Sequence, residues 1–349
     1  MFTRIGIIGA GAVGCVVGGL LTRAGRDVTL IDQWPEHVHV MKRQGLQLSG
    51  SCGEHRIPVK ALHLHELQGV TEPFDALFVA VKGYDTEWAT ALALPYVARP
   101  HGVVVDFQNG INDERVAGLA GRERALGCVI LIGAGMYEPG HAQRTDTGSL
   151  GFKLGELDGA DSERARALAR VMDDVAPSRV TTNLSGERWS KLALNCMANP
   201  LAGLSGLGTA EVRTAPGPRR LAVHLGAEAI QVGRACGHEV EPIWGIAAQR
   251  FVDAVAGIGL ADVEADISRD AVTRGGGRPS MLQDVMRGRR TEVDFLNGHV
   301  VEQGRRAGVK TPFNEAIVEL FHQRGAGALE PDPRNLAPLL AMLPEGDGR

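Results

Sequence analysis

The most informative part of the sequence is Arg4-Ile-Gly-Ile-Ile-Gly9-Ala-Gly11-Ala-Val-Gly14, in which a short apolar run leads into three spaced glycines. The apolar run predicts a buried strand, and the apolar residues from there to position 24 predict a helix. In a dinucleotide-binding turn, Gly9 permits the tight bend, Gly11 lets the backbone approach the pyrophosphate, and Gly14 lets the helix pack on the strand. The helix N-terminus offers N–H groups and partial positive charge to the phosphates. We therefore predict coenzyme contacts from Gly9, Ala10, Gly11, Ala12, Val13 and Gly14.

A second predicted strand, residues 27–31, ends on Asp32, which lies 18 residues after Gly14. At this spacing a carboxylate can accept a hydrogen bond from a ribose 2′-OH. Asp32 could also be a plain strand-end residue that caps the next turn. Because strand, turn, helix and acid occur in the required order, the motif indicates dinucleotide binding more strongly than its glycines alone.

We predict three further strands, at residues 74–81, 101–107 and 126–134, whose carboxyl ends lie at one edge of a parallel sheet. Lys82 follows the first and Asn109 the second, and ligands of such sheets bind beyond the carboxyl ends of the strands. Lys82 could instead be a surface loop residue, and Asn109, which precedes a glycine, could only shape a turn. We count Ala134, at the end of the third strand, with Lys82 and Asn109 as coenzyme-binding.

The pattern then changes from alternating strands and helices to helices alone. Residues 140–156 predict a hairpin and 162–175 an amphipathic helix, and the strand signal stops after 180–182. We place the domain boundary there, which gives an α/β Rossmann-type dinucleotide-binding domain, 1–182, followed by an all-α substrate domain, 183–349. Ser185 is the predicted N-cap of the first helix of the second domain.

Composition excludes several classes of protein. With 349 residues, 44% apolar and 22% charged, the chain suits two globular domains, and its net charge of −4 leaves no basic stripe for nucleic acid. Five scattered cysteines predict neither a disulfide framework nor a metal site, and we expect a reducing cytoplasm. The apolar run 5–21 resembles a signal or membrane segment, but it contains six glycines, three of which form the dinucleotide motif, so we expect no membrane association.

A polar stripe is predicted on a helix just past the midpoint of the chain, in the segment Trp189-Ser-Lys-Leu-Ala-Leu-Asn-Cys-Met-Ala-Asn-Pro200. Lys191, Asn195 and Asn199 are four residues apart, so they line one stripe of a helix whose other faces are apolar. Buried polar groups without partners cost several kcal/mol, so these three must have partners. The stripe could be satisfied inside a core, or it could meet a small anionic or carbonyl ligand.

A second group of polar residues follows the glycine-rich run 275–277. Ser280 and Gln283 have the form of a capping box at a helix start, which does not exclude a hydroxyl that faces a ligand. Asp284, Gly288 and Glu292 are four residues apart, so we place them on one face of the same helix. This face is either a site that another group approaches closely or a solvated acidic surface.

In these residues the chain resembles the ketopantoate reductase family. The resemblance rests on Gly9-x-Gly-x-x-Gly14, Val81-Lys82, Gln108-Asn109-Gly110, Trp189-x-Lys191-x-x-x-Asn195-x-x-x-Asn199-Pro200, Ser280-Met-x-x-Asp284 and Thr291-Glu292-x-Asp294-x-x-Asn297-Gly298. It implies a Rossmann domain, a helical domain and an active site between them. The implied reaction is NAD(P)H-dependent reduction of a 2-keto acid, 2-dehydropantoate (ketopantoate) first, to the 2-hydroxy acid (pantoate), a step of pantothenate biosynthesis.

The resemblance also assigns roles. It implies that Lys191 is the general acid and Glu292 its partner, that Asn195, Asn199 and Ser280 hold the substrate, and that Lys82 and Asn109 lie near the nicotinamide ribose. The residue types fit, because hydride addition to a ketone leaves an alkoxide that needs a proton and a nearby positive charge. A carboxylate beside a buried lysine would keep it charged.

Three positions depart from the family pattern. NADP-using members carry an arginine where this chain has Gln33, and with Asp32 before it we expect NADH to be favoured over NADPH, the family default. Thr209 replaces an asparagine at a substrate-binding position, and the run 129–132 is apolar where many members have polar residues. A bulkier or more apolar keto acid than ketopantoate is therefore an open alternative.

Two other functions remain open alternatives. One is an NAD-dependent D-2-hydroxyacid dehydrogenase of the same architecture, and the other is a non-catalytic dinucleotide-sensing protein, which would be expected to lack a proton donor. The expected partner is a small-molecule keto acid, and the long apolar helices after residue 220 suggest a homodimer.

Overall fold

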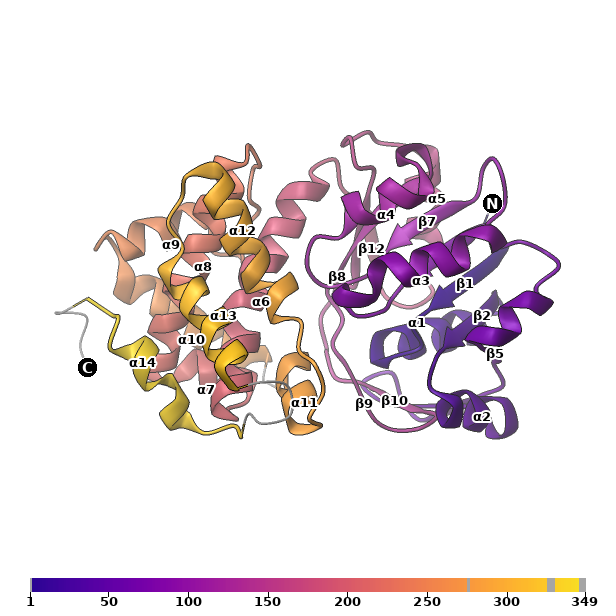
Figure 1. Cartoon of the computed structure of the whole chain (residues 1–349), viewed down its shortest axis with the longest axis horizontal. Coiled ribbons are helices and arrows are strands. Elements are labelled where there is room, and N and C mark those ends of the chain that lie inside the picture. Colours follow the sequence, from indigo (N-terminus) through magenta and orange to yellow (C-terminus); the bar gives the residue numbers. More distant parts are fainter. Residues whose placement is uncertain (1, 275–276, 325–329, 345–349) are drawn as a thin grey trace. The chain divides into compact units, whose positions relative to one another are not determined.

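The computed structural model describes residues 2–274, 277–324 and 330–344, and the chain divides into two compact units, Met1–Leu184 and Ser185–Arg349. The boundary expected at residue 182 lies two residues before this division. Each unit is described by itself below (Figure 1).

The first unit is built on an eight-stranded sheet in the order β12-β11-β8-β7-β6-β1-β2-β5. The strands from β5 to β8 in this order are all parallel, and β11 runs antiparallel to β8. This is the doubly wound arrangement expected from the alternating pattern. The strands are β1 Arg4–Ile8, β2 Asp27–Asp32, β5 Lys60–His63, β6 Ala76–Val79, β7 Val103–Asp106, β8 Ala125–Ile130, β11 Phe152–Gly155 and β12 Ser178–Val180.

Helices cover both faces of this sheet because successive strand residues point to opposite sides. On one face Ile7, Leu30 and Phe78 join a core with α1, α2 and α5, and on the other Ile8, Ile31 and Val79 pack against α3 and α4. The run 5–21 thus folds into β1 and most of α1. The helices are α1 Ala12–Arg23, α2 Pro35–Gln44, α3 Thr86–Ala93, α4 Asp113–Ala120 and α5 Glu163–Met172, with 3₁₀ turns at Leu64–Gly69, Gly83–Asp85, Leu94–Tyr96 and Arg122–Arg124.

A second, four-stranded sheet shows that the predicted hairpin at 140–156 is wrong. It contains β3 (Leu46–Gly50), β4 (His55–Ile57), β9 (Ala134–Glu138) and β10 (His141–Arg144). The tight turn lies earlier, at Gly140 with φ +73°, and it joins β9 to β10. Strand β11 instead returns to the main sheet beside β8. The predicted strand 126–134 is accordingly two strands, and Ala134 begins the second of them.

The second unit is helical in its described parts, apart from one bridge between Ile243 and Ile246. Helices α6 and α8 run antiparallel and approach closely, since a Cβ at Gly233 would lie 2.8 Å from the Trp189 ring and one at Gly226 would lie 2.7 Å from the Met197 sulfur. The helices are α6 Leu184–Ser205, α7 Thr209–Thr214, α8 Pro216–Ala235, α9 Ala248–Val255, α10 Leu260–Arg274, α11 Ser280–Met286, α12 Asn297–Ala307, α13 Pro312–Arg324 and α14 Ala337–Leu340, with 3₁₀ turns at Val293–Phe295 and Pro333–Leu336.

Two local expectations about this unit need comment. Helix α6 begins at Leu184, so Ser185 lies inside its first turn and is not the N-cap that we predicted. Among the helices that the structure describes, none combines the length and the apolar character needed to cross a membrane.

Candidate active site

The glycine turn between β1 and α1 has the shape that a pyrophosphate requires. Gly9 has φ +100°, and a Cβ there would lie 2.6 Å from the Ala80 carbonyl carbon, while one at Gly14 would lie 2.2 Å from the Gly9 oxygen. At Gly11 nothing lies within 4 Å of the position of a Cβ, and no side chain caps the N-terminus of α1. Two glycines thus permit the fold, and the third leaves open space beside uncapped N–H groups, so the turn fits a dinucleotide.

Beneath this turn lies a buried histidine that the sequence did not single out for a role. His37 Nδ1 accepts a hydrogen bond of 2.8 Å from the backbone N–H of Gly140, so its Nε2 carries the proton and donates to the Ala10 carbonyl at 2.9 Å. Burial, the largest effect, lowers the pKa of His37 and keeps the ring neutral. His37 therefore ties the glycine turn to the smaller sheet.

Asp32 lies half-buried at the end of β2, and one of its two oxygens caps the following turn. Its Oδ1 accepts a hydrogen bond of 2.9 Å from the backbone N–H of Trp34. The turn-capping interpretation is thus correct for Oδ1. For Oδ2 the described residues provide no hydrogen bond, so a ribose contact through this atom stays a prediction.

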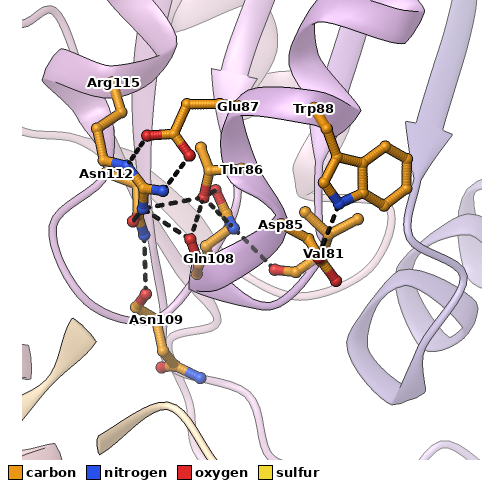
Figure 2. Close-up of polar contacts among 10 residues, drawn as sticks. Val81, Asp85, Thr86, Glu87, Trp88, Gln108, Asn109, Asn112 and Arg115 are labelled. Carbon is orange, nitrogen blue, oxygen red and sulfur yellow. Dashed lines mark hydrogen bonds and ion pairs between the residues drawn. The ribbon is translucent and has the colours of Figure 1, made fainter. Parts of the chain in front are cut away.

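Lys82 and Asn109 follow neighbouring parallel strands, β6 and β7, as predicted. Figure 2 shows the side chain of Asn109 pointing away from the polar residues grouped around Gln108. Its backbone carbonyl accepts a hydrogen bond of 3.1 Å from Asn112 Nδ2. Contacts of Lys82, Asn109 and Ala134 with a coenzyme stay predictions.

In the helical unit, Lys191, Asn195 and Asn199 all lie within α6, so the predicted stripe exists. Asn195 and Asn199 are only 4% and 7% exposed. The described residues give Asn199's amide no hydrogen bond and Lys191's ammonium neither a hydrogen bond nor an ion pair. Burial lowers the pKa of Lys191 to about 8. Glu292 is itself buried, and its role as the carboxylate partner of Lys191 stays a prediction.

The predicted acidic stripe does not lie on one helix, and this prediction is wrong. Helix α11 ends at Met286, Gly288 adopts a left-handed φ of +61°, and Glu292 precedes the 3₁₀ turn Val293–Phe295. The capping box is absent too, because Ser280 is already the first helical residue and the Gln283 amide donates to the Arg278 carbonyl at 2.8 Å.

Both polar segments of the second group nevertheless lie along α6. The rings of Trp189 and His299, on α6 and α12, are 5.7 Å apart, and a Cβ at Gly203 of α6 would lie 3.3 Å from Met281 of α11. Thr209 at the start of α7 donates both its N–H and its hydroxyl to the Gly277 carbonyl at 3.0 Å. The Thr209 hydroxyl therefore braces the segment before Ser280 and has no proton left to donate to a substrate.

Comparison with known proteins agrees with this arrangement. Residues 5–159 match the sequence model of ketopantoate reductase PanE/ApbA, and residues 183–325 match that of its C-terminal region. The chain belongs to the ketopantoate reductase family. The family and the fold class predicted from the sequence are thus confirmed, and the protein is an oxidoreductase that acts on CH–OH groups.

Individual relatives align with this protein over almost the whole chain. The 2-dehydropantoate 2-reductase of Archaeoglobus fulgidus is 30% identical over 320 residues, which are 91% of this chain and 96% of that protein. The crystal structure of the ketopantoate reductase from Ralstonia eutropha JMP134 aligns with a TM-score of 0.74 at 28% identity, over 91% of this chain and 96% of that one. For the 2-dehydropantoate 2-reductase from Geobacter metallireducens GS-15 the TM-score is 0.78 at 26% identity, over 92% and 100%.

Members of the ketopantoate reductase family bind NAD(P)H, and the glycine turn makes a sharp prediction for this coenzyme. Gly11→Ala is expected to leave the melting temperature unchanged, because a methyl group there meets nothing and φ is −71°. The same methyl group would occupy the space of the pyrophosphate, so we expect the Kd for NADH to rise by about 10-fold or more. Thermal unfolding and fluorescence titration measure the two effects.

Gly14→Ala is the matched control, since its methyl group would overlap the Gly9 carbonyl. This variant is expected to lose stability as well as affinity. Unchanged NADH affinity in Gly11→Ala would mean that the pyrophosphate does not lie at this turn.

Proposed function

We propose that this ketopantoate reductase family member reduces a 2-keto acid with NADH, and that ketopantoate is the first substrate to test. The observation that supports the proposal is the polar stripe of α6. A half-buried lysine without an ion pair in the described chain lies four and eight residues from two buried carboxamides. A lysine removed from water without a charged partner is retained at a cost in stability unless a ligand uses it.

The chemistry follows from the residue types. Bound NAD(P)H supplies the hydride that adds to the keto carbon. Negative charge develops on the carbonyl oxygen as the hydride adds, and the Lys191 ammonium stabilises this charge until it donates its proton to the oxygen. A pKa of about 8 suits this role, because a proton donor works best when its pKa is near the operating pH. Asn195, Asn199 and Ser280 are proposed to hold the substrate carboxylate and hydroxyl, and Glu292 to approach Lys191 in the liganded protein.

The residues after β2 support NADH as the preferred coenzyme. A 2′-phosphate beside Asp32 would meet a negative charge, and Gln33 offers no compensating positive one. We expect kcat/KM for NADH to exceed that for NADPH by about 10-fold or more, because one carboxylate a few ångströms from a phosphate costs at least about 1.4 kcal/mol. Steady-state assays with both coenzymes measure this ratio.

Asp32→Ser is the matched variant for this preference. It keeps an oxygen that can accept from Trp34 and removes the charge, so the ratio is expected to fall toward one. If the wild-type enzyme uses NADPH as well as NADH or better, the assignment of Asp32 is wrong.

The hydrogen bond of the Thr209 hydroxyl favours a second substrate class, 2-keto acids other than ketopantoate. The hydroxyl proton is given to the Gly277 carbonyl, so a substrate hydroxyl loses a hydrogen-bond donor at this position. The apolar run 129–132 argues less for a different substrate, since Val129, Ile130 and Ile132 are buried in the core of the first unit. A panel of ketopantoate and other branched or aromatic 2-keto acids decides, and a rate with ketopantoate far below the others would identify a D-2-hydroxyacid dehydrogenase.

A further inference from the structure

A buried amide joins the two loops that carry Lys82 and Asn109. Gln108 lies two residues after the end of β7 and is only 3% exposed. It donates from Nε2 to the Val81 carbonyl at 2.8 Å and to Thr86 Oγ1 at 3.0 Å (Figure 2). The nitrogen must face Val81, because a carbonyl can only accept. Thr86 then gives its single hydroxyl proton to the Gly83 carbonyl at 2.8 Å.

Arg115 of α4 completes the same network from the other side. Its Nη1 donates at 2.7 Å both to the Gly83 carbonyl and to Asn112 Oδ1, and its guanidinium is paired with Glu87. Asn112 in turn donates from Nδ2 to the Asn109 carbonyl. Figure 2 shows these side chains converging from α3, α4 and the loop after β7.

The network acts where the sheet stops supplying hydrogen bonds. The ladder ends with the Ala80 N–H, which donates to Ile8, and the Phe107 N–H, which donates to Val79. Beyond it, the carbonyls on both sides of Lys82, those of Val81 and Gly83, are held by side chains. The Val81 carbonyl belongs to the peptide plane before Lys82, and the plane after it contains the Lys82 carbonyl, which accepts a hydrogen bond of 2.8 Å from the Asp85 N–H. Fixing these two planes fixes the direction in which the Lys82 side chain leaves the backbone, and the bonds to the Gly83 carbonyl hold the turn that follows.

We infer that Gln108 is a positioning residue that holds Lys82 in the orientation required by the nicotinamide end of the coenzyme. The inference rests on the proposed function for the contact of Lys82 with the coenzyme, whereas the hydrogen bonds of Gln108 do not depend on that function. Gln108 itself is buried among protein groups and acts through the backbone of Lys82. Its removal leaves the Val81 carbonyl without this donor and lets the peptide between Val81 and Lys82 rotate.

The test is a double-mutant cycle on NADH affinity and on kcat/KM. Gln108→Leu is expected to raise the Kd for NADH by about 10-fold, the usual effect of one lost buried hydrogen bond. In the Lys82→Ala background the same substitution is expected to change the Kd by less than about 2-fold, because the group that it positions is gone. A loss caused only by weakened folding would appear as the same factor in both backgrounds, and that result would overturn the inference.

Two further variants keep the test decisive. Thr86→Val removes the hydroxyl link to Gly83 without changing shape, and it is expected to show the same dependence on Lys82, so it replaces Gln108→Leu if that protein does not fold. Gln68→Leu is the control, because the Gln68 amide also donates to a carbonyl, that of His65 at 3.2 Å, but on an exposed turn. It is expected to leave Kd unchanged.

Failure of this inference is distinguishable from failure of the proposed function. Wild-type protein that binds NADH but reduces no keto acid would refute the function, and the cycle would still be measured on Kd. Wild-type turnover combined with additive effects of Gln108 and Lys82 would refute the positioning role alone. Repeating the titrations with NADPH covers the case in which that coenzyme binds better.

Discussion

Lys191→Ala is expected to reduce kcat for keto-acid reduction by about 10²–10⁴-fold, the usual contribution of a general acid. The coenzyme should bind with nearly unchanged affinity, because the glycine turn belongs to the other unit of the chain. Single-turnover kinetics with NADH measure the loss. Lys310→Ala, an exposed lysine of the same unit, is the control and should be fully active. A loss of only a few-fold would favour a dinucleotide sensor over an enzyme.

The pH profile separates proton donation from charge. Burial lowers the pKa of Lys191 to about 8, and reduction requires the protonated form. We therefore expect kcat/KM for reduction to fall as the pH rises through about 8, and kcat/KM for oxidation of the hydroxy acid, which needs the neutral amine, to rise over the same range. Lys191→Arg keeps a positive charge that does not titrate, so its residual activity should show no such fall.

The spacing of residues along the sequence predicted those parts of the candidate site that lie within a single turn or helix. The glycine turn and the stripe on α6 depend only on residues within one turn or one helix, so counting along the sequence was sufficient. Counting failed at Glu292, because it assumed a helix that continues through Gly288. The helix ends at Met286, and Gly288 adopts a left-handed φ of +61°. It also failed at 140–156, because β10 pairs in parallel with β3, whose sequence lies more than ninety residues earlier.

The groups that support the site were missed for the same reason. His37 joins Ala10 to Gly140, and Gln108 joins the ends of two strands, so their roles depend on partners that adjacent sequence does not reveal. The local sequence carried little signal, because His37 follows Glu36 and Gln108 precedes Asn109, so neither stands out as a polar residue in an apolar run. A buried polar side chain must find partners, but only the fold shows which ones.

Glu228→Ala is expected to lower the free energy of unfolding by about 3–5 kcal/mol, although this residue plays no part in the proposed chemistry. Glu228 lies on α8, only 7% exposed, and accepts hydrogen bonds of 2.9 Å from the backbone N–H groups of Phe313 and Asn314 and of 2.7 Å from Asn314 Nδ2. It thereby caps α13 from another helix, and alanine would leave three buried donors unpaired. Denaturant unfolding followed by circular dichroism measures the loss.

Glu315→Ala is the matched control for the stability measurement. Glu315 also carries a carboxylate at the start of α13, but it is exposed and its ion pair with Arg305 spans 3.7 Å. Its removal should cost less than about 0.5 kcal/mol. An equal loss in the two variants would show that Glu228 stabilises α13 only as a negative charge near the helix N-terminus, and not through its buried hydrogen bonds.

The stability contributed by Glu228 should also depend on pH in a direction opposite to that of most carboxylates. Burial, the largest effect, raises the pKa of Glu228 to about 7 in the folded protein, against the hydrogen bonds from Phe313 and Asn314. The folded state then binds the proton more tightly, so this contribution is complete below about pH 4.5 and is lost as the pH rises through about 7. Relative to Glu228→Gln, which does not titrate, the wild type should lose about 3 kcal/mol over this interval. A difference that stays constant would mean that three N–H donors at a helix N-terminus outweigh burial and hold the carboxylate ionised.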